Sequence, residues 1–166
     1  MLRHFLLATG LVLLPAIASA QELSGTWVRD GARSDVVPNS MYWTTQGVDS
    51  GGTRGPNTQF VIEVEQTADS LRVTDPTRPL RVYPLDGQAH TVPADTGIVD
   101  ATITASVQGD AVVVERAQTY SGLPGGVILN TEENWQLGAD GNSLVITTSR
   151  ETPAKTFTYT EVYTRQ

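Results

Sequence analysis

Apolar and polar side chains alternate along most of the chain after residue 59. Phe60, Ile62 and Val64 fall on one side of this alternation, and Glu63 and Glu65 fall on the other. A period of two is the spacing of a β-strand with one buried and one solvated face. Similar stretches recur at residues 71–74, 80–85, 98–107, 112–114, 127–137, 144–150 and 156–165. The pattern predicts an all-β protein.

Turn signals interrupt the alternation at regular places. The dipeptides Asp86-Gly87, Gly109-Asp110 and Asp140-Gly141 are typical of hairpins, because glycine accepts the positive φ that a tight turn requires. Residues 90–97 are expected to form a loop. The strands are therefore expected to follow one another as antiparallel hairpins.

Residues 23–30 are predicted to form the first strand, which carries Trp27. Gly25 allows the strand to bend and another backbone to approach closely. The indole of Trp27 buries a large apolar area. Trp27 is therefore expected either to plug one end of a barrel or to serve as an ordinary core tryptophan.

Residues 36–57 are predicted to form a long loop, because Gly, Ser, Thr, Asn and Pro are frequent there. A connection of this length inside a compact domain is usually functional or disordered. It carries Met41, Tyr42 and Trp43 in a row. Two interpretations stay open: the aromatic side chains form a lid over a barrel mouth, or the loop folds back and covers apolar surface of the barrel.

Residues 1–20 are predicted to be a secretory signal peptide. Arg3 precedes the apolar run 5–14, and the small residues Ala18-Ser19-Ala20 form a cleavage site. Residues 21–166 are thus expected to be the exported domain, periplasmic or extracellular. The apolar run is shorter than the ~20 residues of a membrane helix. The chain contains no Cys, so no disulfide framework supports the fold.

The charge balance of the chain is acidic. It has 11 basic and 18 acidic residues, and removal of the leader with Arg3 gives 10 − 18 = −8. Such a chain is a poor partner for nucleic acid or anionic lipid. The outward faces carry Glu63, Glu65 and Arg72, where a lipid-facing barrel needs an apolar band. We therefore expect no nucleic-acid partner and no membrane insertion.

The alternation also places charged and aromatic side chains on the apolar faces of the strands. Two arginines, two glutamates and two tyrosines share the parity of the apolar positions: Arg116, Arg150, Glu133, Glu161, Tyr159 and Tyr163. Buried charges are costly unless they are paired. Three interpretations stay open: solvated strand ends, internal Arg-Glu pairs, or a site in which arginines hold a carboxylate and aromatic side chains line an apolar tunnel.

Signals for catalysis and for metal binding are weak. The chain has no Cys, and His90 is the one histidine left after the leader, so we expect no thiol nucleophile, no metal site and no cofactor. The sequence Asp140-Gly141-Asn142 resembles part of a calcium loop but lacks its terminal glutamate. Glu133 and Glu161 stay open as a carboxylate pair. An enzymatic role is thus uncertain and less favoured than binding.

Several short motifs follow one another along the chain: Gly25-Thr26-Trp27, Arg33-Ser34-Asp35, and residues 83–87, 109–114, 133–137 and 140–144. Their order resembles that of bacterial secreted lipocalin-like domains of the calycin group, over most of residues 23–165. The resemblance implies a single up-and-down antiparallel β-barrel of about eight strands. It also implies that Arg165 packs on Trp27 and closes the barrel, as a basic residue does in lipocalins. Residues 36–57 depart from the family pattern, and most members have no assigned function.

These observations favour an exported, soluble lipocalin-like protein that binds a small amphipathic or hydrophobic ligand in the barrel cavity. Gly25, Trp27 and Arg165 are expected to close the barrel. One alternative is a filled barrel that acts through its loops as an interaction or inhibitor module of the cell envelope. Another is a cofactorless enzyme that uses Glu133 or Glu161. The residues expected to contact the ligand are Tyr42, Trp43, Arg116, Trp135, Arg150 and Tyr159.

Overall fold

The computed structural model describes residues 22–38, 52–76, 78–92, 98–120, 127–151 and 155–166. In these ranges the chain forms strands and connections without a helix, which confirms the all-β class. The strands in chain order are β1 (Gly25–Arg29), β2 (Val37–Pro38), β3 (Gly52–Arg54), β4 (Val61–Gln66), β5 (Ser70–Asp75), β6 (Arg78–Pro84), β7 (Asp86–Val92), β8 (Ile98–Gln108), β9 (Ala111–Tyr120), β10 (Val127–Leu137), β11 (Ser143–Glu151) and β12 (Thr156–Arg165).

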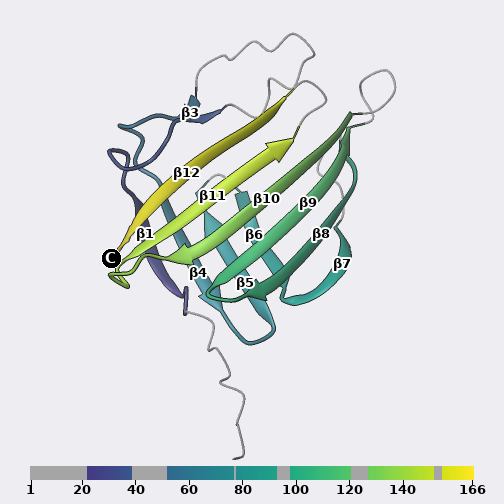
Figure 1. The fold of residues 1–166 in the computed structure, drawn as a ribbon, viewed down its shortest axis with the longest axis horizontal. Coiled ribbons are helices and arrows are strands. Elements are labelled where there is room, and N and C mark those ends of the chain that lie inside the picture. Colours follow the sequence, from purple (N-terminus) through teal and green to yellow (C-terminus); the bar gives the residue numbers. More distant parts are fainter. Residues whose placement is uncertain (1–21, 39–51, 77, 93–97, 121–126, 152–154) are drawn as a thin grey trace, which may run out of the picture.

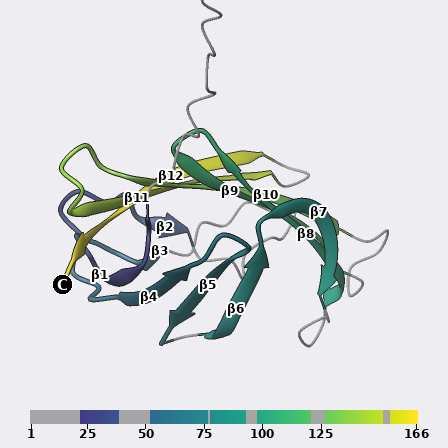
Figure 2. The same cartoon turned by 90° about the horizontal axis from the view of Figure 1, so that it is seen from below.

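Ten of these strands form one antiparallel sheet that curls into a nearly closed barrel (Figure 1). The order is β6-β5-β4-β1-β12-β11-β10-β9-β8-β7. β6 and β7 lie at the two ends of this order, although only Leu85 separates them in sequence. Among the described residues no strand pairing joins β6 to β7, and we term the boundary between them the seam (Figure 2). The sheet thus has ten strands, and the expected count of about eight is too low.

β7 is the strand of the main sheet that the pattern did not predict, and it corrects two expectations. Asp86-Gly87 does not form a hairpin turn, and residues 90–92 do not belong to a loop, because all of them lie in β7, the strand that pairs with β8. The register shifts between Asp86 and Ala89, where Gly87 has a φ of 69°. The positive φ of the glycine therefore serves a bulge inside a strand instead of a turn.

The other two glycine signals mark hairpins as predicted. Gly109 and Gly141 have φ values of 64° and 66° in the β8–β9 and β10–β11 connections. In the second hairpin, Asp140 Oδ1 accepts hydrogen bonds from the backbone N–H groups of Asn142 at 2.9 Å and Ser143 at 3.0 Å. The bond from Asn142, followed by one from the Ser143 hydroxyl, holds the pKa of Asp140 below its usual value. Local turn chemistry thus helps to set the register of β10 against β11.

Apolar side chains around Trp27 fill one end of the barrel interior. Trp27 is fully buried, and its Nε1 donates a hydrogen bond to Leu23 O at 2.9 Å. The guanidinium carbon of Arg165 lies 4.2 Å from the centroid of the Trp27 ring. A Cβ on Gly25, which has a φ of 149°, would stand 2.8 Å from Arg165 Nη1, so this closure requires glycine. We term the following side chains the apolar end: Leu23, Trp27, Leu71, Val112, Trp135, Leu144 and Tyr163.

The stretch expected to be a long loop contains a short two-stranded sheet. Val37 of β2 pairs with Arg54 of β3, and Val37 is buried. At the start of the stretch, Asp35 N–H donates to Thr160 O of β12 at 2.8 Å. Residues 41–43 lie outside the described residues, so the choice between a lid and a cover stays a prediction.

Candidate functional site

Charged and polar side chains form a belt inside the barrel, next to the apolar end. Thr131 on β10 lies opposite Arg116 on β9 and Arg150 on β11. Glu133 and Trp135 follow Thr131 on the same face of β10, so the interior changes from polar to apolar within four residues. We term the following side chains the polar belt: Arg29, Asp75, Arg81, Arg116, Thr131, Glu133, Thr148, Arg150 and Glu161.

Tyr83 joins two arginines of the polar belt. Its hydroxyl oxygen accepts hydrogen bonds from Arg116 Nη2 at 3.1 Å and from Arg81 Nη1 at 3.4 Å. Arg81 Nη2 also donates to Asp75 Oδ2 at 2.8 Å, which pairs Arg81 with a buried carboxylate. The bond from Arg116 on β9 to Tyr83 on β6 crosses the seam, which no strand pairing crosses in the described residues.

Arg116 differs from Arg29 and Arg81 because no carboxylate neutralises it directly. In the described part of the chain, no Asp or Glu oxygen lies within salt-bridge distance of its guanidinium. Its hydrogen-bond partner, Tyr83, is a phenol. Burial raises the pKa of Tyr83, and the negative charge of Glu133 adds to the increase. The phenol therefore stays neutral near neutral pH and leaves the charge of Arg116 uncompensated.

Glu133 faces the same space as Arg116 but has another partner. Its Oε2 accepts a hydrogen bond from Trp135 Nε1 at 3.0 Å, so a polar atom of the apolar end is bonded to the belt. Tyr159 is also close enough to Glu133 for its pKa to be affected. Burial raises the pKa of Tyr159, the positive charge of Arg150 lowers it, and the negative charge of Glu133 raises it further. Arg116 and Glu133 are thus opposite charges on neighbouring strands that do not form an ion pair with each other.

Arg29 and Glu161 form a buried ion pair on the β1 side of the belt. Arg29 Nε lies 3.0 Å from Glu161 Oε1, and the two side chains are 0% and 5% exposed. The other nitrogens of Arg29 donate to Gly55 O at 2.8 Å and to Asp35 O at 2.7 Å. The pair therefore ties both ends of the 36–54 stretch to the barrel. Since Glu161 is held by Arg29 and Glu133 by Trp135, their interpretation as an acid-base pair is weakened.

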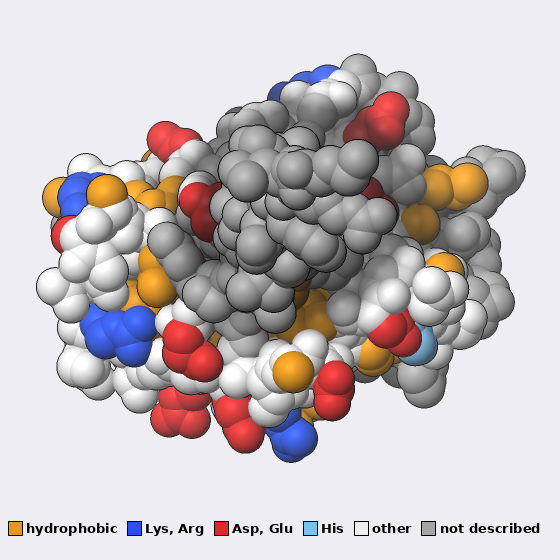
Figure 3. Space-filling view, turned by 60° about the horizontal axis from the view of Figure 1, so that its bottom comes forward, with side chains coloured by type: hydrophobic (Ala, Val, Ile, Leu, Met, Phe, Trp, Pro, Cys, Tyr) orange, Lys and Arg blue, Asp and Glu red, His pale blue; other side chains and the backbone are white. Residues whose placement is uncertain are grey.

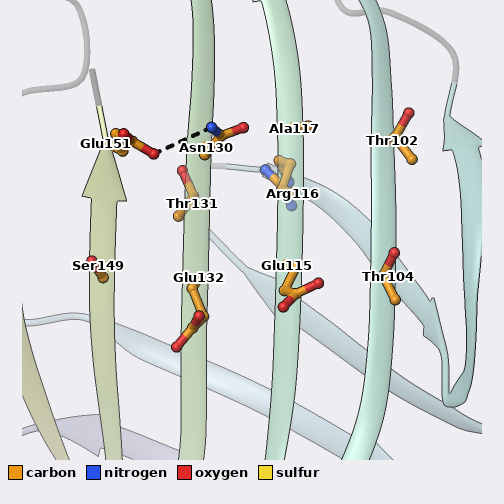
Figure 4. A pocket seen from close by; sticks show the side chains of 10 residues that line it. All are labelled: Thr102, Thr104, Glu115, Arg116, Ala117, Asn130, Thr131, Glu132, Ser149 and Glu151. Carbon is orange, nitrogen blue, oxygen red and sulfur yellow. Dashed lines mark hydrogen bonds between the residues drawn. The ribbon is translucent and has the colours of Figure 1, made fainter. Parts of the chain in front are cut away.

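The outer face of β8–β11 carries a hollow of about 340 Å³ (Figure 4). Its lining is mostly hydroxyl, amide and carboxylate side chains, with Glu132 on β10 directly opposite Glu115 on β9. Like charges in this position destabilise a sheet. Asn130 Nδ2 donates to Glu151 Oε2 at 3.4 Å across the same face. Arg116 contributes to the hollow, but its guanidinium is bonded to Tyr83 and does not neutralise these acids.

The distribution of charge differs between the surface and the interior. Acidic side chains are spread over the face in Figure 3, as expected for a formal charge of −7. Four of the 11 basic residues, in contrast, belong to the polar belt. Among the described residues no helix is long and apolar enough to cross a membrane. No group of three or more His, Cys, Asp or Glu side chains in this part of the chain is placed to hold a metal ion.

The structure brings together most of the residues expected to contact a ligand. Tyr42 and Trp43 lie outside the described residues. The sequence analysis missed Asp75, Arg81 and Tyr83. Asp75 shares the parity of the buried apolar positions of β5, which was a signal for it. On β6, however, the apolar Leu80 and Val82 have the opposite parity to Arg81 and Tyr83 and are exposed. Four of the expected contact residues face the barrel interior: Arg116, Trp135, Arg150 and Tyr159.

Comparisons with known proteins support the fold and nothing finer. No protein-family model matches the chain, and no curated protein matches it in sequence. Among solved structures, the chain is similar to the crystal structure of secretory abundant heat soluble protein 4 from Ramazzottius varieornatus. The TM-score is 0.50 at 13% sequence identity, and the match covers 89% of this chain and 96% of that chain. The chain is thus a nearly closed antiparallel barrel with a distant structural neighbour.

Proposed function

We propose that this protein is an exported lipocalin-like barrel that binds one small amphipathic ligand in its interior after removal of residues 1–20. The observation that carries the proposal is the polar belt. Charged groups inside a protein cost stability unless every one of them is paired and hydrogen-bonded. A barrel that needed only a core would continue the apolar end along the same strands, and groups retained at such a cost are typical of functional sites.

The polar head of the ligand would lie at the belt, and its apolar part would lie beyond the belt, away from Trp27. In that direction two inward side chains are apolar and buried, Ala101 on β8 and Leu129 on β10. Both are in register with Gln118 of β9, two positions beyond Arg116. Phe157 follows on β12, opposite Arg150. The polar belt and the apolar side chains beyond it therefore match the polar head and the apolar tail of an amphipathic molecule.

The experiment is a titration of purified residues 21–166 with the neutral fluorescent amphiphile N-phenyl-1-naphthylamine. We expect a saturable rise in fluorescence with one site per chain, and displacement of the dye by decanoate. Thr148→Phe fills the interior next to Glu133 and should abolish the rise. Thr147→Phe is the matched control, because Thr147 is the next residue on β11 and faces outward, towards Thr160.

Folding of each variant is checked by circular dichroism and by its unfolding midpoint. Ala101→Phe, with Thr102→Phe as its outward control, replaces the first pair if Thr148→Phe does not fold. The absence of saturable binding in the unmodified protein would contradict the proposal and favour a filled barrel that acts through its surface. Equal loss of binding in the inward and outward variants would also contradict it.

A further inference from the structure

The arginines of the polar belt are not equivalent as partners for a ligand. The guanidinium of Arg29 is used by Glu161 and by two backbone carbonyl groups, and Arg81 is paired with Asp75. Arg116 has the hydroxyl of Tyr83 as its hydrogen-bond acceptor and no carboxylate within ion-pair distance in the described residues. A guanidinium carries five N–H donors, so most donors of Arg116 are available to another group.

Those donors are also accessible. Among the described residues, Arg81 Nε is the one buried side-chain nitrogen or oxygen without a hydrogen-bond partner. The nitrogens of Arg116 that do not bond Tyr83 are not in this class, and the residue is partly exposed. The partly exposed Arg116 side chain is thus anchored at one nitrogen by Tyr83, and its remaining donors have no hydrogen-bond partner among the described residues. A guanidinium held in this way is preorganised to receive an anionic oxygen.

Glu133 limits how much negative charge a ligand can carry beside the guanidinium of Arg116. It lies on the strand next to Arg116, with Val114 directly opposite it and Arg116 two positions further along β9. Its carboxylate is bonded to Trp135 Nε1 and interacts electrostatically with Arg81, but no arginine of the described residues lies within ion-pair distance of it. One negative charge on a ligand would balance Arg116. A second would face the charge of Glu133, and like charges repel strongly in a site of low dielectric constant.

We propose that the polar belt selects single-chain amphiphiles with one negative charge on the head group, and that Arg116 receives this charge. The inference rests on the proposed function, namely that the interior binds an amphipath. Tyr83 positions Arg116 from across the seam, and the Arg81–Asp75 pair fixes the environment of Tyr83. Glu133 discriminates against dianionic head groups.

The experiment compares ligands that share a decyl chain and differ in the head group. Displacement of N-phenyl-1-naphthylamine is measured with decanoate, decyl sulfate, decyl phosphate and decanol at about pH 8, where a carboxylate and a sulfate are singly charged. For the unmodified protein we expect decanoate and decyl sulfate to bind about 10- to 100-fold more tightly than decanol, as charged hydrogen bonds allow. Decyl phosphate, which is largely a dianion at this pH, should bind more weakly than decyl sulfate.

The variants separate a binding role of Arg116 from a structural one. Arg116→Met should lower the affinity for decanoate about 10- to 100-fold and leave the affinity for decanol nearly unchanged. Arg116→Lys should keep most of the preference for the anion, and Tyr83→Phe should reduce it less than Arg116→Met does. Arg72→Met is the matched control, because Arg72 is an exposed arginine on β5. Glu133→Gln should raise the affinity for decyl phosphate.

The outcomes distinguish this inference from the proposed function. If neither decanoate nor decanol displaces the dye, the proposed function fails together with the inference. If both bind equally to the unmodified protein, the barrel binds amphipaths and the inference is overturned. If Arg116→Met weakens decanoate and decanol by the same factor, Arg116 acts only by closing the seam, and the inference is again overturned. A change in the ratio of the two affinities supports it, because loss of a structural contact would not move this ratio.

Discussion

The apolar end and the polar belt are built from the same strands and contribute to the protein in opposite ways. At the apolar end, Trp27 is fully buried and its one polar atom is bonded to Leu23 O. In the belt, Arg116 lies four residues beyond Val112 on the same face of β9, and its charge is not neutralised by Glu133. The first region stabilises the barrel. The second costs stability, which natural proteins tolerate where function requires it.

Trp27→Ala tests the first half of the comparison and should have the largest effect. Removing a fully buried indole from the apolar end leaves a cavity and also removes the ring under Arg165. We expect the free energy of unfolding, measured by urea denaturation, to fall by about 3–5 kcal/mol. A decrease of less than about 1 kcal/mol in this free energy would show that Trp27 does not stabilise the apolar end.

Glu161→Gln tests whether the paired part of the belt is structural. The substitution keeps the shape of the side chain but removes the charge that Arg29 faces at 3.0 Å. We expect a loss of about 2 kcal/mol in the free energy of unfolding. Glu65→Gln is the control, because Glu65 pairs with Arg72 on the surface and such pairs contribute ~0–1 kcal/mol. Equal losses in the two variants would argue against a structural role for the buried pair.

Glu132→Gln probes the outer face of the strands that carry the belt, and its effect should be smaller and opposite in sign. Glu132 stands directly opposite Glu115, so removal of its charge should raise the free energy of unfolding by ~0.2–1 kcal/mol. Glu63→Gln removes the same charge from an exposed position opposite Thr74. Urea denaturation should show a higher free energy of unfolding for Glu132→Gln and little change in this free energy for the control. A loss of stability in Glu132→Gln would contradict the pairing.

The ionisation of the Tyr83 phenol provides the mildest test, because the stability linked to it does not change near neutral pH. Burial raises the pKa of Tyr83 above 10.0. The stability linked to this group is therefore fully present below the unfolded pKa of about 10 and is lost as pH rises through the folded value. The tyrosinate absorbance of the protein minus that of Tyr83→Phe should give a titration above pH 10. A difference spectrum that titrates at or below pH 10 would place Tyr83 in contact with solvent.

Much of the fold followed from local pattern, because a period of two needs only neighbouring residues to be recognised. The same pattern predicted that Arg116, Arg150, Glu133 and Glu161 share the parity of the core, and they do face inward. The pattern could not show which of the charged side chains contact one another. The bond between Arg116 and Tyr83 depends on how far the sheet curls, and this is a property of the whole barrel.

Local signals also failed where tertiary context reversed their meaning. Asp86-Gly87 is typical of a turn, yet the sheet continues through it, because the glycine conformation also suits a bulge. The role of Arg29 was missed for another reason. Its partners Glu161, Gly55 and Asp35 come from three separate parts of the chain, and no spacing rule links them.

The most direct test of the binding account is carbon-13 NMR of decanoate labelled at its carboxyl carbon and bound to residues 21–166. The pH titration of the bound carboxyl reports the charge that it meets. If Arg116 receives the head group, the pKa of the bound carboxyl should lie below that of free decanoate and return towards it in Arg116→Met. A bound carboxyl whose pKa is equal to or above the free value would show an apolar or anionic surrounding and would contradict the account.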